Sequence, residues 1–245
     1  MIGVVVPVHN EEQYLEACLI ALTVACTHPL LDGEPVVIVL VLDDCSDRSA
    51  AIARRHARRH LPAGHLTCLT IAARNVGKAR HAGAVHLLAR QARWLAFTDA
   101  DTRVAPDWLV AQLALRADAV CGLVMVDDWS LHPPHVPALF YAHYRWQDEH
   151  RHIHGANLGV CSHAYRRTGG FPPQATHEDV ALVLRLMAID ARIAWSCQPR
   201  VVTSGRPRGR LPGGFADHLA ALAAAPDLPS PPHDGAGEAT APEGV

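Results

Sequence analysis

The residues best suited to chemistry are two aspartates one residue apart, Asp99 and Asp101, which follow the apolar run 94–98. Carboxylate oxygens are the ligands that Mg²⁺ and Mn²⁺ prefer, and both aspartates of such an Asp-x-Asp (DXD) motif can reach one ion. A metal bound there keeps open positions for phosphate oxygens. The alternative is that one aspartate caps a helix beginning near Pro106. Their place directly after a buried strand favours the metal site.

Further carboxylates follow two other apolar runs. Run 2–6 leads into Pro7-Val8-His9-Asn10-Glu11-Glu12, and run 36–42 leads into Asp43-Asp44-Cys45-Ser46-Asp47. If the three runs are strands of one parallel sheet, their carboxyl ends meet at one edge, where such sheets bind ligands. Like charges gathered there repel one another unless a cation or a donor-rich ligand neutralises them. We therefore expect a cation and a polar ligand at this edge.

Three residues near this edge have both a functional and an ordinary structural interpretation. Asn10 can cap the helix that follows it. Asp44 can accept hydrogen bonds from a nucleobase or a ribose. Lys78 follows an Asn75-Val76-Gly77 turn and can face a phosphate, although such a turn is also a common start of a helix.

Short β-branched runs alternate with helical patterns in the first half of the chain, which predicts right-handed βαβ units. The runs are apolar throughout, so we expect a mainly parallel central sheet flanked by helices on both faces. The expected strands of this half are 2–6, 36–42, 66–71 and 94–98. For the second half we expect strands 119–125, 157–162, 193–196 and 200–203, and helices 136–150, 177–190 and 215–225.

Composition narrows the class of protein. The 245 residues are 49% hydrophobic and suit one α/β domain over 1–225, followed by a disordered tail of Pro, Gly, Glu and Ala over 226–245. A net charge of −2 indicates no nucleic-acid partner. The seven cysteines form no Cys-x-x-Cys pair, and with no leader evident they indicate reduced thiols and a cytoplasmic location. The longest apolar run is too short for a transmembrane segment, although peripheral membrane contact stays possible.

Taken in order, these segments resemble the family 2 glycosyltransferases, which have the GT-A fold, a Rossmann-like fold of the nucleotide-diphospho-sugar transferase superfamily. The resemblance covers roughly residues 2–205. Besides the segments that end the first, second and fourth strands, it rests on Arg74-Asn75-Val76-Gly77-Lys78-Ala79-Arg80, Gly155-Ala156-Asn157-Leu158-Gly159, Gly169-Gly170-Phe171 and His177-Glu178-Asp179-Val180.

The resemblance implies a metal-dependent hexosyltransferase, an inverting enzyme of class EC 2.4. Its donor is a nucleotide-diphosphate sugar, with UDP the commonest choice, and its acceptor is a small molecule, a lipid or a glycan. Residues 1–103 would bind the donor and residues 104–225 the acceptor. The implied site residues are Pro7, Asn10, Glu12, Asp44, Lys78 and Asp99 for the nucleotide sugar, Asp99 and Asp101 for Mg²⁺ or Mn²⁺, and Gly155, Asn157 and Glu178 for the acceptor side.

Asp179 falls where these enzymes place the catalytic base. Displacing a nucleoside diphosphate needs a base for the acceptor proton and a cation for the developing charge. Backbone amides at a helix start would hold this carboxylate in place but also lower its basicity, so burial would have to offset them. The alternative is that Glu178 and Asp179 are merely favourable residues for a first helical turn.

Some features depart from the family pattern. Cys45 stands where glycine is common, His9 stands where an aromatic residue is common, and no Gln-x-x-Arg-Trp motif follows Asp179, which argues against a processive polysaccharide synthase. No late histidine in 201–204 completes the metal ligands. His150, His152 and His154 could line the acceptor pocket or be ordinary core or surface residues. A silent sugar-nucleotide-binding scaffold and a nucleotidyltransferase remain alternatives, although the acidic segment 7–12 disfavours the latter.

Overall fold

The apolar runs of the first half become strands, of which three are largely buried and the one over 66–71, at the edge of the sheet, is only partly buried. The computed structural model describes residues 1–209 and 214–224. Its first strands are β1 (Ile2–Val8), β2 (Val36–Asp43), β3 (Leu66–Ile71) and β4 (Trp94–Phe97). Every residue of β2 is buried, as expected for a strand covered by helices on both sides.

These strands join β5 (Thr102–Val104), β6 (Ala119–Val126), β7 (Leu158–Cys161) and β8 (Ile193–Thr203) in one sheet. The strand order is β3-β2-β1-β4-β7-β6-β8-β5. Strands β7 and β5 run against the common direction of the others, so the prediction of a mainly parallel sheet is confirmed. Strands from both predicted halves, 1–103 and 104–225, therefore share one sheet.

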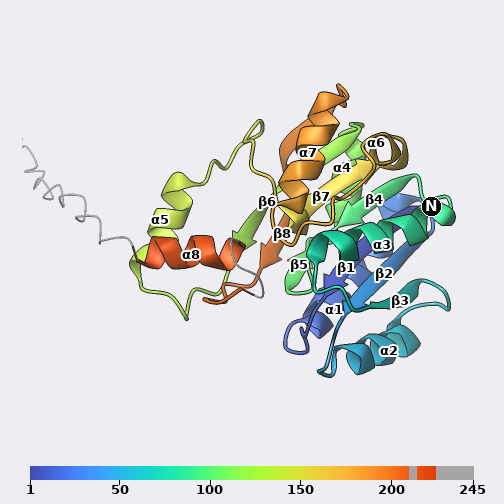
Figure 1. The fold of residues 1–245 in the computed structure, drawn as a ribbon, viewed down its shortest axis with the longest axis horizontal. Coiled ribbons are helices and arrows are strands. Elements are labelled where there is room, and N and C mark those ends of the chain that lie inside the picture. Colours follow the sequence, from blue (N-terminus) through green and yellow to red (C-terminus); the bar gives the residue numbers. More distant parts are fainter. Residues whose placement is uncertain (210–213, 225–245) are drawn as a thin grey trace, which may run out of the picture.

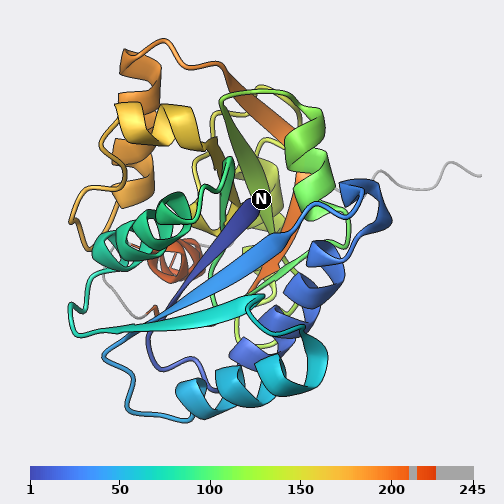
Figure 2. The ribbon, with the colours of Figure 1, turned by 90° about the vertical axis from the view of Figure 1, so that its right-hand side faces the viewer.

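Helices cover the two faces of the sheet in separate groups (Figure 2). One face carries α1 (Leu15–Cys26), α2 (Ser49–His60) and α4 (Trp108–Ala114), whose apolar residues join one core cluster. The other face carries α3 (Val76–Ala89), α6 (Ser162–Arg167) and α7 (Glu178–Ala188), which build a second cluster. The short 3₁₀ turns are η1 (Pro29–Leu31) and η2 (Gly155–Asn157).

Two further helices, α5 (His135–His143) and α8 (Phe215–Ala223), lie apart from these layers. They pack against each other beyond the end of the sheet at which β8 terminates (Figure 1). The helix expected over 136–150 is therefore shorter, because Tyr144 leaves helical geometry and the chain continues in an irregular segment to His154.

Several local expectations differ from the structure. Asn10 does not cap α1, which starts only at Leu15; its backbone is left-handed, with φ of 54°. The two short strands expected near the end are one strand, β8, whose irregular register absorbs residues 197–199. Strand β5 and helix α6 were not expected from the sequence. The tail expected to be disordered, 226–245, lies outside the described residues.

No helix in the part of the chain that the structure describes is both long enough and apolar enough to cross a membrane.

The fold brings the predicted edge together. Since β1, β2 and β4 are parallel neighbours, their carboxyl ends lie side by side. Asp99 and Asp101 form the tight turn between β4 and β5, where the amide of Thr102 bonds to the carbonyl of Asp99 over 3.1 Å. Ala100 points into the core and is 2% exposed, which leaves the two carboxylates on the outer side. Strand β8 ends beside this turn because it pairs with β5.

Candidate active site

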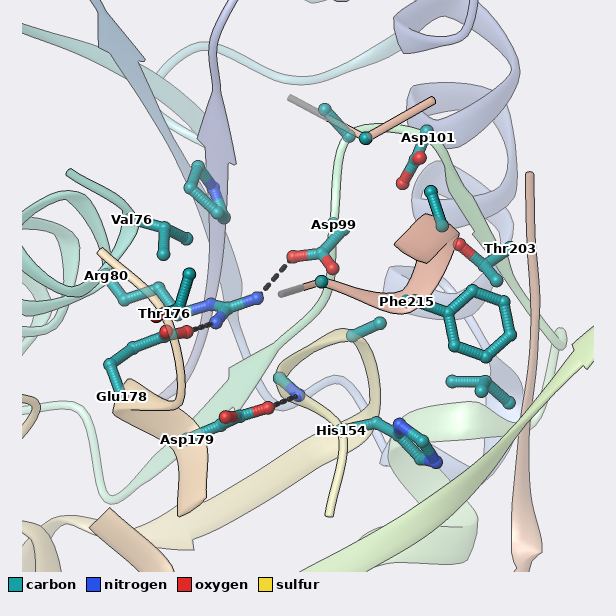
Figure 3. Close-up of a pocket in the computed structure, with 18 of the residues that line it drawn as sticks. Val76, Arg80, Asp99, Asp101, His154, Thr176, Glu178, Asp179, Thr203 and Phe215 are labelled. Atoms are coloured by element: carbon teal, nitrogen blue, oxygen red, sulfur yellow. Dashed lines mark hydrogen bonds and ion pairs between the residues drawn. The ribbon is translucent and has the colours of Figure 1, made fainter. Parts of the chain in front are cut away.

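A cavity of about 730 Å³ opens at this edge and reaches from the strand ends to α5 and α8 (Figure 3). Of the predicted site residues, six line it: Pro7, Asp99, Asp101, Gly155, Glu178 and Asp179. The lining also includes two arginines that sequence reasoning did not single out, Arg80 and Arg206. Ligand-sized concave sites of this kind usually gather a few convergent polar groups, and these residues fit that pattern.

Arg80 is a buried residue that links two acidic residues of the cavity. It lies on α3, is 4% exposed, and pairs through one guanidinium nitrogen with Asp99 and through the other with Glu178 (Figure 3). Its Cζ atom lies 5.8 Å from the centre of the Phe171 ring, and its Nε has no hydrogen-bond partner among the described residues. A buried guanidinium needs paired carboxylates, so Arg80 links the Asp99 turn to the start of α7.

Arg206 is the second cation of the cavity; it follows β8 and is partly buried. Its Nη1 atom lies 2.8 and 2.9 Å from the two carboxylate oxygens of Glu11, and its Nη2 atom lies 3.0 Å from Oδ2 of Asp101. Burial opposes the charge of Arg206, but the attraction of Asp101 and Glu11 outweighs it and raises the pKa of Arg206. Burial also raises the pKa of the Asp101 carboxyl, and Arg206 counteracts part of that rise. The hydroxyl of Ser204 donates to the same Asp101 oxygen over 2.6 Å.

The two adjacent carboxylates at the start of α7 have different environments. Glu178 is 3% exposed and tied to Arg80. Asp179 is only partly buried, and its Oδ2 accepts the amide of Gly155 over 2.7 Å while its Oδ1 accepts its neighbour's amide, that of Val180 (Figure 3). Asp179 is therefore the carboxylate of this pair that is oriented and open to the cavity.

Gly155 is needed for close packing rather than for an unusual backbone angle. A Cβ atom at this position would overlap the guanidinium of Arg80. Gly77, which we considered for close approach to a ligand, instead lets the carbonyls of Pro172 and Gln174 approach α3. Both glycines thus hold neighbouring segments together around the cavity.

Of the other predicted donor-binding residues, Asn10, Glu12, Asp44 and Lys78 are not among the cavity-lining residues. The Oδ1 atom of Asn10 accepts backbone amides from residues 46 and 47, and Glu12 pairs with Arg48. Asp44 pairs with Arg74, and Lys78 is exposed on the first turn of α3. Asn10, Glu12 and Asp44 thus organise the loops around the edge, and a direct role of these four residues in donor binding stays a prediction.

Asp43 lies nearer the cavity than its neighbour. It lines the cavity, is 4% exposed, and accepts three backbone amides, those of Ala73, Arg74 and Asn75, over 2.6 to 2.9 Å. It fixes the loop that precedes α3, whose first turn is capped by the Asn75 side chain.

Asn157 lies in the core below the cavity. It is 0% exposed, and its amide bonds to the carbonyls of Leu123 and Pro199 and accepts the indole N–H of Trp108 over 2.9 Å. Its hydrogen bonds hold β6, β8 and α4 together, and its predicted place on the acceptor side stays a prediction.

The far side of the cavity is lined by six ring side chains, which we call the ring wall. They come from α5, the segment after it and α8, and are Phe140, Tyr144, His152, His154, Phe215 and His218. His152 and His154, two of the three histidines considered for an acceptor pocket, thus line the cavity. The third, His150, is buried and is not among the lining residues.

Asp99 and Asp101 are the residues that could hold a divalent cation. Their carboxylates are hard oxygen ligands. Across 1–209 and 214–224, no three His, Cys, Asp or Glu side chains are arranged to hold an ion. One oxygen of each aspartate is engaged by a guanidinium, Arg80 or Arg206. The protein therefore fits a cation that takes two carboxylates from it and the remaining ligands from phosphate and water.

Comparison with solved structures gives the fold. The mannosyltransferase PcManGT from Pyrobaculum calidifontis, in complex with GDP-Man and Mn²⁺, is 21% identical, with 85% of this chain and 58% of that chain covered and a TM-score of 0.66. S. aureus TarS 1-349 in complex with UDP is 14% identical, with 91% and 70% covered and a TM-score of 0.61. These similarities show the GT-A fold that the sequence predicted.

A third structure extends the comparison. Glucosyl-3-phosphoglycerate synthase from Mycobacterium tuberculosis, in complex with Mn²⁺, UDP and phosphoglyceric acid, is 17% identical, with 91% of this chain and 74% of that chain covered and a TM-score of 0.55. No curated protein sequence matches the chain. The family description "Glycosyl transferase family 2" matches residues 3–166, well over half of the sequence, and the chain therefore belongs to glycosyl transferase family 2.

Proposed function

We propose that the protein transfers a sugar from a nucleotide-diphosphate sugar to a hydroxyl of an acceptor, by a single inverting displacement with Asp179 as the base. The main observation in support of the proposal is that its two functional parts line the same cavity. An oriented carboxylate, Asp179, faces the same space as the Asp99-Asp101 turn and its two arginines. These are the two parts that such a displacement needs, a base and a site for the diphosphate charge.

The donor is expected at the strand-end side. The similar structures were solved with GDP-Man, or with UDP, and two of the three contain Mn²⁺, which supports a nucleotide sugar as the donor here. We favour a UDP sugar, with GDP as the competing choice. Pro7 and Asp43, at the ends of β1 and β2, line the cavity on the side where we expect the nucleoside, and Arg80 and Arg206 would supply positive charge for the diphosphate.

A divalent metal, Mn²⁺ or Mg²⁺, fits Asp99 and Asp101 and would neutralise the charge that develops on the departing diphosphate. Arg80 and Arg206 each balance one of the two aspartates, which explains how two carboxylates so close together are tolerated at this edge. Both guanidiniums are also positioned to donate hydrogen bonds to phosphate oxygens when the carboxylates are otherwise engaged.

At the acceptor side, Asp179 takes the proton of the attacking hydroxyl. The hydroxyl oxygen then bonds to the anomeric carbon as the bond from that carbon to the diphosphate oxygen breaks, and the configuration inverts. Glu178 does not compete for the base role because Arg80 holds it in a buried ion pair. The amide of Gly155 keeps the Asp179 carboxylate pointing at the cavity.

Nucleotide binding tests the proposal. Thermal unfolding should be measured with UDP, GDP and dTDP, each with and without Mn²⁺, for the wild type and for Asp101→Asn. We expect a metal-dependent rise of the unfolding midpoint with one nucleotide, and loss of that rise in the variant. The absence of a rise with all three nucleotides would contradict the donor site. A rise accompanied by no transfer to any acceptor would favour a silent sugar-nucleotide-binding protein.

A further inference from the structure

The ring wall points to the chemistry of the acceptor, which depends on the proposed function. We propose that the acceptor is an uncharged molecule with a flat apolar face, either an aromatic ring or the apolar face of a sugar ring. This face would stack on the ring wall, with the reacting hydroxyl directed at Asp179. Three features of the wall lead to this conclusion: the geometry of its rings, the engagement of their polar atoms, and their charge.

The rings form a stacked surface rather than a set of separate contacts. The ring of His152 lies parallel to that of Tyr144, with centroids 4.2 Å apart and an interplanar angle of 11°. His154 stacks on the other rings at 5.8 Å from Tyr144, and Phe215 meets His154 edge-on at 6.2 Å and 88°. Because these rings line the cavity, a flat ligand in it could gain the same kinds of stacked and edge-on contact, which contribute binding energy.

Three polar atoms of the wall are used within the protein: the Tyr144 hydroxyl and the Nε2 atoms of His152 and His154. The Val124 amide can only donate, so the hydroxyl of Tyr144 accepts it over 3.0 Å and gives its own proton to Nε2 of His154 over 2.7 Å. The Nε2 atom of His152 accepts the amide of Arg145 over 3.1 Å. These three atoms are therefore engaged within the protein. Tyr144 is itself covered by the rings of Phe140 and His152, which stack on it with centroid distances of 4.9 and 4.2 Å. The ring surface left for a ligand therefore comes mainly from the histidines and Phe215 that line the cavity.

The two sides of the cavity differ in charge. None of the six wall side chains is a carboxylate, an ammonium or a guanidinium, and burial lowers the pKa of His152 and, to about 3, that of His154. The charged residues among the described lining come from the strand ends and from α3 and α7. Within that described lining, an anionic acceptor would find its cations only at Arg74, Arg80 and Arg206, where the diphosphate is expected.

The wall also adjoins the base. His154 directly precedes Gly155, whose amide holds the Asp179 carboxylate, so the wall and the base meet at one peptide (Figure 3). Under this proposal, an acceptor stacked on the wall extends past Gly155 and brings its reacting hydroxyl to Asp179. The reacting hydroxyl need not be recognised by the wall itself, because Asp179 accepts its proton.

Binding of three probes tests this proposal: 4-nitrophenyl β-D-glucoside, which carries an aromatic ring and a sugar, methyl β-D-glucoside, which carries the sugar alone, and the anion glucose 6-phosphate. Dissociation constants would be measured by calorimetry with and without UDP and Mn²⁺. We expect at least one neutral probe to bind and glucose 6-phosphate not to compete with it. Preference for the nitrophenyl compound identifies an aromatic face, and equal binding of both glucosides identifies a sugar face.

Substitutions in the ring wall then test whether the neutral probe binds there. Phe215→Leu keeps an apolar side chain but loses the flat ring, and it should weaken the neutral probe by about 3- to 10-fold. His218→Ala removes an exposed ring of the wall and keeps the test usable if Phe215→Leu fails to fold. Tyr141→Leu is the matched control, because Tyr141 lies on α5 and is 40% exposed but is not among the cavity-lining residues. Its affinity should stay within twofold of the wild type.

The proposal would be overturned by tighter binding of glucose 6-phosphate than of both neutral probes, or by unchanged affinity in both wall variants. Binding of none of the probes while UDP and Mn²⁺ still bind would also overturn it and leave the proposed donor site standing. Loss of UDP binding with retained, wall-dependent binding of a neutral probe would instead contradict the transferase proposal and support the wall as a binding site.

Discussion

Acidification should destabilise the protein through His154, a partly buried residue of the ring wall. Burial lowers the pKa of His154 from 6.5 to about 3. The unfolded chain therefore takes up a proton near pH 6.5, whereas the folded chain stays neutral until about pH 3. Stability from this residue is fully present above the unfolded value and is lost as the pH falls toward the folded value.

The size of the loss follows from linkage. One pH unit within this window is worth about 1.4 kcal/mol, so lowering the pH from 7.5 to 5 should reduce the free energy of unfolding by about 2 kcal/mol through His154 alone. Burial is the main reason why the ring resists protonation, and the neighbouring histidines add to it. An imidazolium could also no longer accept the proton of the Tyr144 hydroxyl at Nε2.

The measurement is urea unfolding followed by circular dichroism at several pH values, for the wild type and for His154→Gln. The Gln carbonyl can accept the Tyr144 proton but does not titrate, so the variant should lose about 2 kcal/mol less than the wild type over this range. His163→Gln, at an exposed position on α6, serves as the control and should follow the wild type. Parallel pH profiles of His154→Gln and the wild type would refute the reasoning.

Three more substitutions test the packing and the charges of the site. Gly155→Ala should lower the free energy of unfolding by about 1–3 kcal/mol in urea titrations, because its Cβ would overlap Arg80; an unchanged midpoint would contradict this contact. Asn157→Leu should lower the free energy of unfolding by roughly 3 kcal/mol or more in the same assay, because it leaves the Trp108 indole and two carbonyls without hydrogen-bond partners. A neutral effect would mean that these groups find other partners. Arg206→Gln should tighten Mn²⁺ binding several-fold in the absence of nucleotide, measured by electron paramagnetic resonance, because Arg206 competes for Asp101; weaker binding would show that Arg206 supports the metal site instead.

The sequence predicted that several carboxylates meet at one edge of the sheet, and the reason is physical. Strands that are apolar throughout indicate a parallel sheet, and parallel neighbours necessarily bring their carboxyl ends together. The sequence alone therefore assigns Asp99 and Asp101 to the same edge as Pro7. Asp179 could be singled out only with the help of the family resemblance, since its local sequence also fits an ordinary first helical turn.

The sequence did not predict the positions of Arg80 and Arg206 or the existence of the ring wall. Arg80 sits one turn into a helix, and only the packing of α3 against α7 shows that it faces Glu178. Arg206 reaches Glu11 across 195 positions of sequence, a separation that no local pattern records. Glu12, which the resemblance singled out, pairs with Arg48, whereas its neighbour Glu11 is the one that lines the cavity.

The ring wall depends on two helices that pack together beyond the sheet. Phe140 and Phe215 are far apart in the sequence, and their rings lie 5.9 Å apart because α5 and α8 contact each other. Histidines at alternate positions from 150 to 154 hinted at a pocket, but the sequence did not distinguish core from lining. That distinction follows from the irregular backbone after Tyr144, which places His150 in the core and His152 and His154 at the cavity.

The most direct test of the central claim is turnover of the nucleotide sugar by Asp179→Asn. Asparagine keeps an oxygen for the Gly155 amide but is a far weaker base, so the donor should still bind with unchanged affinity. We expect the transfer rate to the acceptor to fall by at least about 100-fold, the usual minimum for loss of a general base. Transfer within about twofold of the wild-type rate, with donor binding intact, would contradict Asp179 as the base and with it the proposed mechanism.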